Sequence, residues 1–141
     1  MITNENEILE LLPSRINSSE EILNIIKSGK IKSNHIALIK SLIYCNNTII
    51  AYWLDIDVKM YRKCISSETD ISNGLQERLV MLLALIKHGI DYWGTETKLK
   101  AWLSQENFYL DGTKPLSLLN TFEGIMFIDN MLTGMEYGDN A

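Results

Sequence analysis

The sequence predicts an all-α protein that consists of a helix-turn-helix unit and a second, C-terminal helical unit. Proline stands only at Pro13 and Pro115 of the 141 residues, so long stretches contain no helix breaker. Apolar residues recur at helical spacing, and Phe108-Tyr109-Leu110 is the only short stretch with a strand signal. Hydrophobic residues make up 46% and charged residues 22%, which is typical of a globular protein with a sizeable core.

Capping and stop signals divide the first half of the chain into short helices. Pro13 ends a helix over residues 4–12, and Gly29 ends the next one. Ser33 is expected to cap a third helix, which the pair Asn46-Asn47 ends. Two further short helices are expected at 47–54 and 57–65.

One long helix dominates the second half. Ser72 or Asn73 begins it, Gly94 ends it, and apolar residues on several faces predict that it is the buried central helix of its unit. Thr95 then caps a shorter helix, and a final helix is expected from about Thr121 to Leu132. The main stripe of the long helix consists of Leu75, Leu79, Leu82, Ile86, Ile90 and Trp93.

Charge is distributed unevenly along the chain, whose formal net charge is −5. Residues 1–27 carry −3, residues 28–67 carry +4 from six bases against two acids, and residues 68–141 carry −6. An acidic chain as a whole repels nucleic acid. However, charges beyond about 8 Å are largely screened at physiological salt, so the basic segment can still meet phosphate. The alternative is that this segment is an ordinary solvated face.

Several classes of protein are not expected. The chain has no run of 18 apolar residues and no signal-peptide pattern, so we expect a cytoplasmic protein with no membrane partner. Cys45 and Cys64 are expected to be small core residues. His35 and His88 lie in no metal-site or catalytic spacing and are expected at the surface or half-buried. We therefore expect no enzyme activity, no cofactor and no metal site.

Residues 47–65 have the spacing of a helix-turn-helix. Ala51 is the small residue where the two helices cross, and Asp55 stands at the turn position that requires positive φ. Tyr61 and Cys64 are expected to face inward. The alternative is a helical hairpin that only packs. The outward residues of the second helix, which would face the major groove of DNA, are Asp57, Val58, Lys59, Arg62 and Lys63.

These outward residues are expected to play different parts in DNA binding. Arg62 or Lys59 is suited to read a guanine edge, because long cationic side chains donate to guanine in the major groove. Lys63 and Lys32 are expected to contact phosphates. Asp57 is expected to cap the second helix rather than touch DNA.

The C-terminal segment contains Trp102-Leu103, then Leu110-x-Gly112-x-x-Pro115 and Leu118-Leu119-x-Thr121. This pattern resembles the toxin-binding domain of the Xre/MbcA/ParS antitoxins. The resemblance extends over about residues 28–138, because Leu54–Lys63 is also similar to the family's helix-turn-helix segment. The chain departs from the pattern at the turn glycine (Asp55), at a recognition-helix threonine (Met60) and at the arginine of the closing motif (Gly134). The matching positions are Trp93-Gly94, Trp102-Leu103, Asn107, Leu110, Gly112, Pro115-Leu116, Leu118-Leu119, Thr121, Gly124, Leu132, Met135-Glu136 and Gly138.

The resemblance implies a type II antitoxin. Residues 28–67 would be an Xre-like helix-turn-helix, residues 71–138 the toxin-binding domain, and residues 1–27 an acidic helical lead involved in dimerisation. The implied partner is a RES-domain toxin of the same operon, which consumes NAD⁺ or transfers its ADP-ribose, and whose NAD cleft the antitoxin blocks. The family also implies binding to the double-stranded DNA of the operon's own promoter, as a homodimer.

The residues of the final helix are compatible with a partner surface. They include more large apolar side chains than one core-facing stripe needs, so some should be exposed. The acidic residues near the end suit a cationic cleft. The alternative is a fully buried core helix. The expected toxin-binding residues are Met131, Leu132, Met135, Glu136, Tyr137 and Asp139.

Two other functions stay open at this point. One is a helix-turn-helix transcription regulator without a toxin partner, in which the C-terminal unit serves only for dimerisation. The other is an antitoxin that has lost DNA binding.

Overall fold

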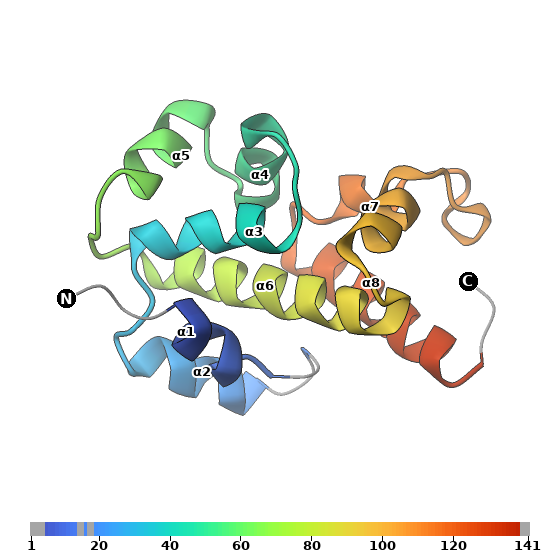
Figure 1. The fold of residues 1–141 in the computed structure, drawn as a ribbon, viewed down its shortest axis with the longest axis horizontal. Helices are drawn as coiled ribbons and strands as arrows, with labels where there is room; N and C mark the ends of the chain where they lie inside the picture. Colours follow the sequence, from blue (N-terminus) through green and yellow to red (C-terminus); the bar gives the residue numbers. More distant parts are fainter. Residues whose placement is uncertain (1–4, 14–15, 17–18, 139–141) are drawn as a thin grey trace.

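A long helix with a buried middle lies at the centre of the computed structural model, which describes residues 5–13, 16 and 19–138 (Figure 1). This helix is α6 (Asn73–Trp93). The Ser72 hydroxyl accepts a hydrogen bond from the Leu75 N–H (3.2 Å), and Gly94 ends the helix with a φ of 90°. Every residue from Leu79 to Ile86 is buried. The sequence prediction of a buried central helix is confirmed.

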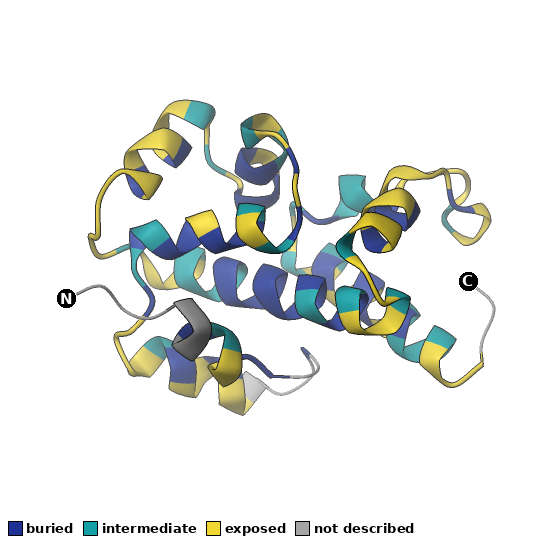
Figure 2. Ribbon diagram, viewed as in Figure 1, coloured by how far each residue is buried: buried dark blue, intermediate teal, exposed yellow. Residues whose placement is uncertain are grey.

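The other helices cover α6 on several sides. Helices α2, α3, α4, α7 and α8 each contact it directly, which explains why apolar residues occur all around it. In Figure 2 the middle of α6 is dark blue, whereas the outer helices show exposed residues on the sides that face away from it. The remaining elements are α1 (Glu5–Leu11), α2 (Ser19–Lys27), η1 (Ser33–Ile36), α3 (Ala37–Leu42), α4 (Asn47–Leu54), α5 (Val58–Ile65), α7 (Glu96–Ser104), η2 (Phe108–Leu110), η3 (Pro115–Leu118) and α8 (Phe122–Glu136).

The described part of the chain contains helices and turns and no strand, so the all-α prediction is confirmed. None of the described helices is long and apolar enough to cross a membrane. The one short stretch with a strand signal, residues 108–110, forms the 3₁₀ helix η2. The final helix continues through Glu136, about one turn beyond the expected end at Leu132.

Ser33 does not cap a helix, contrary to the expectation. It is the first residue of η1, and its buried hydroxyl donates to the Ser67 carbonyl (2.6 Å) and accepts from the Thr69 N–H (3.0 Å). The side chain therefore ties η1 to the segment that leads from α5 into α6. This role depends on a residue 34 positions away and leaves no local sequence signal.

One continuous hydrophobic core runs from the N-terminal lead to α8. Ile8 and Ile25 of the lead, Leu54 of α4, and Ile128 of α8 all belong to it, together with the buried face of α6. The lead also makes polar contacts with the C-terminal half, because the Lys87 amine donates to the Leu9 carbonyl (3.2 Å). Dimerisation through the lead stays a prediction.

The first turn of α8 lies very close to η3, and Gly124 permits this approach. A Cβ atom at Gly124 would lie 1.8 Å from the Leu118 carbonyl oxygen, which no side chain can occupy. The Thr121 hydroxyl caps the same turn by accepting from the Gly124 N–H (3.0 Å). Glycine at this position is therefore required by packing.

We predict that Gly124→Ala lowers the free energy of unfolding by at least about 1–3 kcal/mol, because the backbone must move to make room for the methyl group. Gly74→Ala is the matched control. It has open space around its Cβ position, and alanine favours a helix interior by roughly 0.5–1 kcal/mol over glycine. Urea unfolding followed by circular dichroism measures both variants. Equal stability of Gly124→Ala and the parent chain would contradict the packing account.

Candidate functional site

Helices α4 and α5 meet in a tight turn with the geometry expected of a helix-turn-helix. Asp55 adopts the left-handed conformation (φ 56°, ψ 43°), and the Ile56 N–H donates to the Ala51 carbonyl (3.0 Å). The Asp57 carboxylate accepts from the Met60 N–H (2.7 Å) at the start of α5. Tyr61 and Cys64 are buried. The expected positive φ, the cap and the inward residues are confirmed.

The outer face of α5 is basic. Lys59, Arg62 and Lys63 are exposed, and none of them forms an ion pair within the part of the chain that the structure describes, whereas Val58 is half-buried. Lys32 is differently placed, because its amine pairs with Asp70 (2.5 Å). The hydrogen bond from Lys32 and its charge lower the pKa of the Asp70 carboxyl group. Lys32 is therefore partly neutralised as a phosphate contact.

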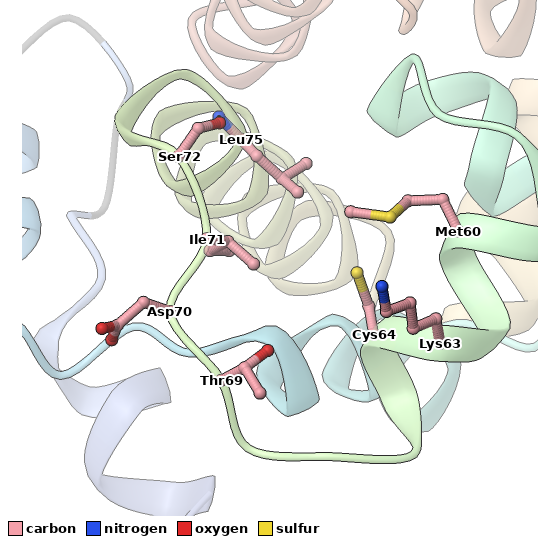
Figure 3. Close-up of a pocket in the computed structure, with 8 residues that line it drawn as sticks. All are labelled: Met60, Lys63, Cys64, Thr69, Asp70, Ile71, Ser72 and Leu75. Carbon is pink, nitrogen blue, oxygen red and sulfur yellow. The ribbon is translucent and has the colours of Figure 1, made fainter.

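A pocket of about 280 Å³ lies between α5 and the start of α6 (Figure 3). Met60, Cys64 and Lys63 line it from α5, and Ile71 and Leu75 line it from the other side. Lys63 thus lies at the edge of this pocket as well as on the basic outer face of α5.

Burial raises the pKa of the Cys64 thiol and raises that of Cys45 to about 11, so both are protonated at neutral pH. Both cysteines are buried, as the sequence predicted.

Helix α4 is fixed to η3 by side chains of neighbouring residues. The Trp53 indole N–H donates to the Leu116 carbonyl (2.9 Å), and the Tyr52 hydroxyl donates to the Ser117 carbonyl (2.7 Å). Trp53 is buried, so it is a packing residue rather than a platform for a nucleic-acid base. These bonds join α4 to the segment that precedes α8.

Two exposed apolar side chains lie side by side in the sequence of α8. Met126 is 41% and Phe127 is 52% exposed, although both belong to a helix whose opposite face is fully buried. Met131 and Met135 are half-buried and Tyr137 is exposed. Residues spaced three or four positions apart share one face of a helix, so 127, 130, 131, 134 and 137 form one outward stripe with Met126 at its edge. We call Met126, Phe127, Met131 and Tyr137 the α8 face.

The structure shows how far each residue expected to bind a toxin is exposed. Leu132 is 0% exposed and belongs to the core, so it supports the helix from behind. Glu136 contacts His88. Asp139 lies outside the described residues. Sequence reasoning missed Met126 and Phe127 as members of the face, because the apolar pattern does not show which residues of an all-apolar run turn away from the core.

His88 of α6 lies between two carboxylates of α8. Its Nδ1 is 2.7 Å from an oxygen of Asp129, and its Nε2 contacts Glu136. The hydrogen bond to Asp129 is the largest influence on the ring and raises the pKa of His88, burial opposes this, and Glu136 adds to the increase. His35 is buried as well, with its Nδ1 accepting from the Lys32 N–H (2.9 Å). The expectation that both histidines are at the surface or half-buried was wrong.

The segment that contains Trp102, η3, Gly124 and α8 has a known counterpart. Residues 88–138 match the family model of the antitoxin Xre/MbcA/ParS C-terminal toxin-binding domain. The C-terminal part of this chain is an Xre/MbcA/ParS toxin-binding domain. Its partner is accordingly a toxin, and the α8 face lies within the matched residues. A comparison with curated proteins gave no match.

The toxin-binding domain and the α4–α5 pair should depend on each other through Trp53. We predict that Trp53→Phe lowers the free energy of unfolding by about 1–3 kcal/mol, since it leaves a void and an unpaired Leu116 carbonyl. Tyr52→Phe removes only an exposed hydrogen bond and should change it by no more than about 1 kcal/mol. Thermal unfolding of the two variants measures the difference. Equal effects would mean that the indole contact is unimportant.

Proposed function

We propose that this chain neutralises a RES-domain toxin through the α8 face and binds the promoter of its own operon through α5. It is proposed to act by binding, without catalysis. The observation that supports toxin binding most directly is the exposure of Met126 and Phe127 on a helix of the toxin-binding domain. Exposed apolar side chains that share one side of a helix are stabilised when a partner covers them.

The charge of the C-terminal half supports the choice of partner. Residues 68–141 carry five bases against eleven acids. A RES-domain toxin must hold the pyrophosphate of NAD⁺, so its cleft is expected to be cationic. Attraction between an acidic antitoxin and a cationic cleft speeds association and sets orientation. Tyr137 stands at the C-terminal end of the α8 face, and the acidic residues Glu136 and Asp139 flank it.

The proposal is tested with the product of the reading frame adjacent to that of this chain. The purified neighbour is incubated with NAD⁺, and NAD⁺ loss is followed with and without one equivalent of the full chain. NAD⁺ loss that stops on addition of the chain supports the proposal. A neighbour that does not consume NAD⁺, or whose activity is unchanged by the chain, contradicts the RES partner and leaves the DNA-binding regulator as the stronger candidate.

Phe127→Asp is expected to weaken toxin binding by at least about tenfold, because a charge must be buried where an aromatic ring packed. Phe108→Asp is the matched control, since Phe108 is 88% exposed on η2, outside the α8 face. It should change the affinity by less than about twofold. Isothermal titration calorimetry with the toxin measures both. Weaker binding by Phe108→Asp and unchanged binding by Phe127→Asp would place the interface elsewhere.

DNA binding through α5 is proposed because the turn between α4 and α5 has the geometry of a helix-turn-helix and because α5 exposes three cationic side chains, those of Lys59, Arg62 and Lys63. The double variant Lys59→Glu with Arg62→Glu should abolish binding to the upstream DNA in a mobility shift. In the parent chain, DNA binding should weaken steeply as the salt concentration rises, since the Lys and Arg side chains displace counterions from the phosphates. Lys98→Glu with Lys114→Glu makes the same change of net charge at exposed sites outside α5 and should bind nearly as the parent does.

If both double variants bind equally, α5 is not the reading helix. A chain that shows no shift at low salt would favour an antitoxin that has lost DNA binding.

A further inference from the structure

His88 connects α6 to the end of α8 that carries the proposed toxin-binding face. Asp129 and Glu136 are seven residues apart, about two helical turns, and so lie on the same side of α8. His88 and Asp129 are both buried, whereas the Glu136 side chain is 33% exposed. His88 is the first residue of the matched domain and Glu136 lies near its last, so this contact joins the two ends of the domain.

When both carboxylates are ionised, this arrangement calls for a proton on each ring nitrogen. An ionised carboxylate only accepts hydrogen bonds, and a neutral imidazole has one N–H. Two carboxylates can therefore be satisfied together only by the imidazolium form. A neutral ring would place a nitrogen lone pair against one of the two carboxylates, and that contact would be lost.

The two carboxylates differ in how easily they can give up their contact with the His88 ring. Asp129 is 4% exposed in its side chain, and its second oxygen accepts from the Ile16 N–H (3.3 Å) of the lead. Glu136 lies at the last turn, where water can replace the imidazole. Among the described residues, Asp129 and Glu136 are the titratable groups that act on the ring, while the neighbouring Lys87 amine is bonded to the Leu9 carbonyl. Loss of the ring proton should thus free Glu136 first.

We propose that His88 is a positioning residue for toxin binding: as an imidazolium it holds Glu136 and the last turn of α8 against α6, and it releases them when it loses its proton. The last turn positions Tyr137, which directly follows Glu136. This inference rests on the proposed function of the α8 face. The toxin binds the form in which Glu136 and the last turn of α8 are held by His88. Toxin affinity should therefore fall as pH rises through the pKa of His88.

The raised pKa of His88 sets the direction in which stability changes with pH. The pKa of His88 is raised in the folded chain, so its contribution to stability is fully present below the pKa of an unfolded histidine and is lost as pH rises through the folded value. The amides in the last turn of α8 should therefore become less protected from hydrogen exchange as pH rises through the folded pKa of His88.

The first experiment uses the full chain without toxin. The His88 ring signals are followed by NMR against pH, and amide hydrogen exchange of residues 133–137 is measured after correction for its intrinsic pH dependence. The parent should lose protection in this turn as His88 deprotonates. Glu136→Gln should lower the pKa of His88 and remove that transition. Glu123→Gln, in the first turn of the same helix, should change neither the pKa of His88 nor the pH-dependent loss of protection.

The inference fails if His88 titrates while the last turn keeps its protection, or if Glu136→Gln leaves the pKa of His88 unchanged. These outcomes do not involve the toxin, so the proposed function would stand.

The second experiment measures toxin affinity against pH. His88→Gln should weaken binding about tenfold at low pH, the scale of one lost charge-assisted hydrogen bond, and should make affinity independent of pH over the His88 titration. His35→Gln replaces the other buried histidine and should preserve the pH dependence. Affinity that rises with pH in the parent would overturn the inference. If Phe127→Asp also leaves the affinity unchanged, the proposed function fails separately.

Discussion

The fold depends on the burial of α6 from nearly every side. A helix with apolar residues on all faces cannot be stable in water alone, because its surface must be removed from solvent. Here the lead, α3, α4, α7 and α8 each supply part of the cover. Several helices together are needed to bury α6, because each contacts only part of its surface. The α4–α5 pair and the toxin-binding domain are thus built on the same support.

This shared support places the two proposed binding surfaces on a common frame. Helix α5 contacts η1 and α4, and α4 is bonded through Trp53 and Tyr52 to η3. The backbone of η3 in turn fixes the first turn of α8 at Gly124. At the other end of α8, His88 of α6 holds the last turn. Both ends of the α8 face are consequently positioned by contacts that lead back to the central helix.

Much of the fold could be predicted from the sequence because its signals are local. Ser72, Thr95 and Thr121 cap the helices that follow them, and Gly94 ends α6, each through bonds to residues within one turn. Asp55 indicated the turn of the helix-turn-helix, since few residues other than glycine adopt positive φ. These effects need no knowledge of distant parts of the chain, and the structure agrees with them.

The candidate site was less predictable because its contacts join distant segments. His88 meets Asp129 and Glu136 across 41 and 48 residues, and no spacing rule connects them. The exposure of Phe127 and the burial of Leu132 depend on the angle at which α8 packs on α6, which an apolar run does not reveal. Residues 108–110 carry the only strand signal of the sequence because aromatic residues favour strands, but the bonds of Asn107 and Asp111 close a 3₁₀ turn there.

Native-state hydrogen exchange on the full chain tests most directly whether both surfaces share one core. The account predicts that the slowest amides of α4, α6 and α8 exchange with the same free energy of opening, equal to that of global unfolding, and that Trp53→Phe lowers all three together. Opening of α4 at a clearly lower free energy than α6 and α8, with no effect of Trp53→Phe on α8, would contradict it. In that case the α4–α5 pair and the toxin-binding domain would be independent units.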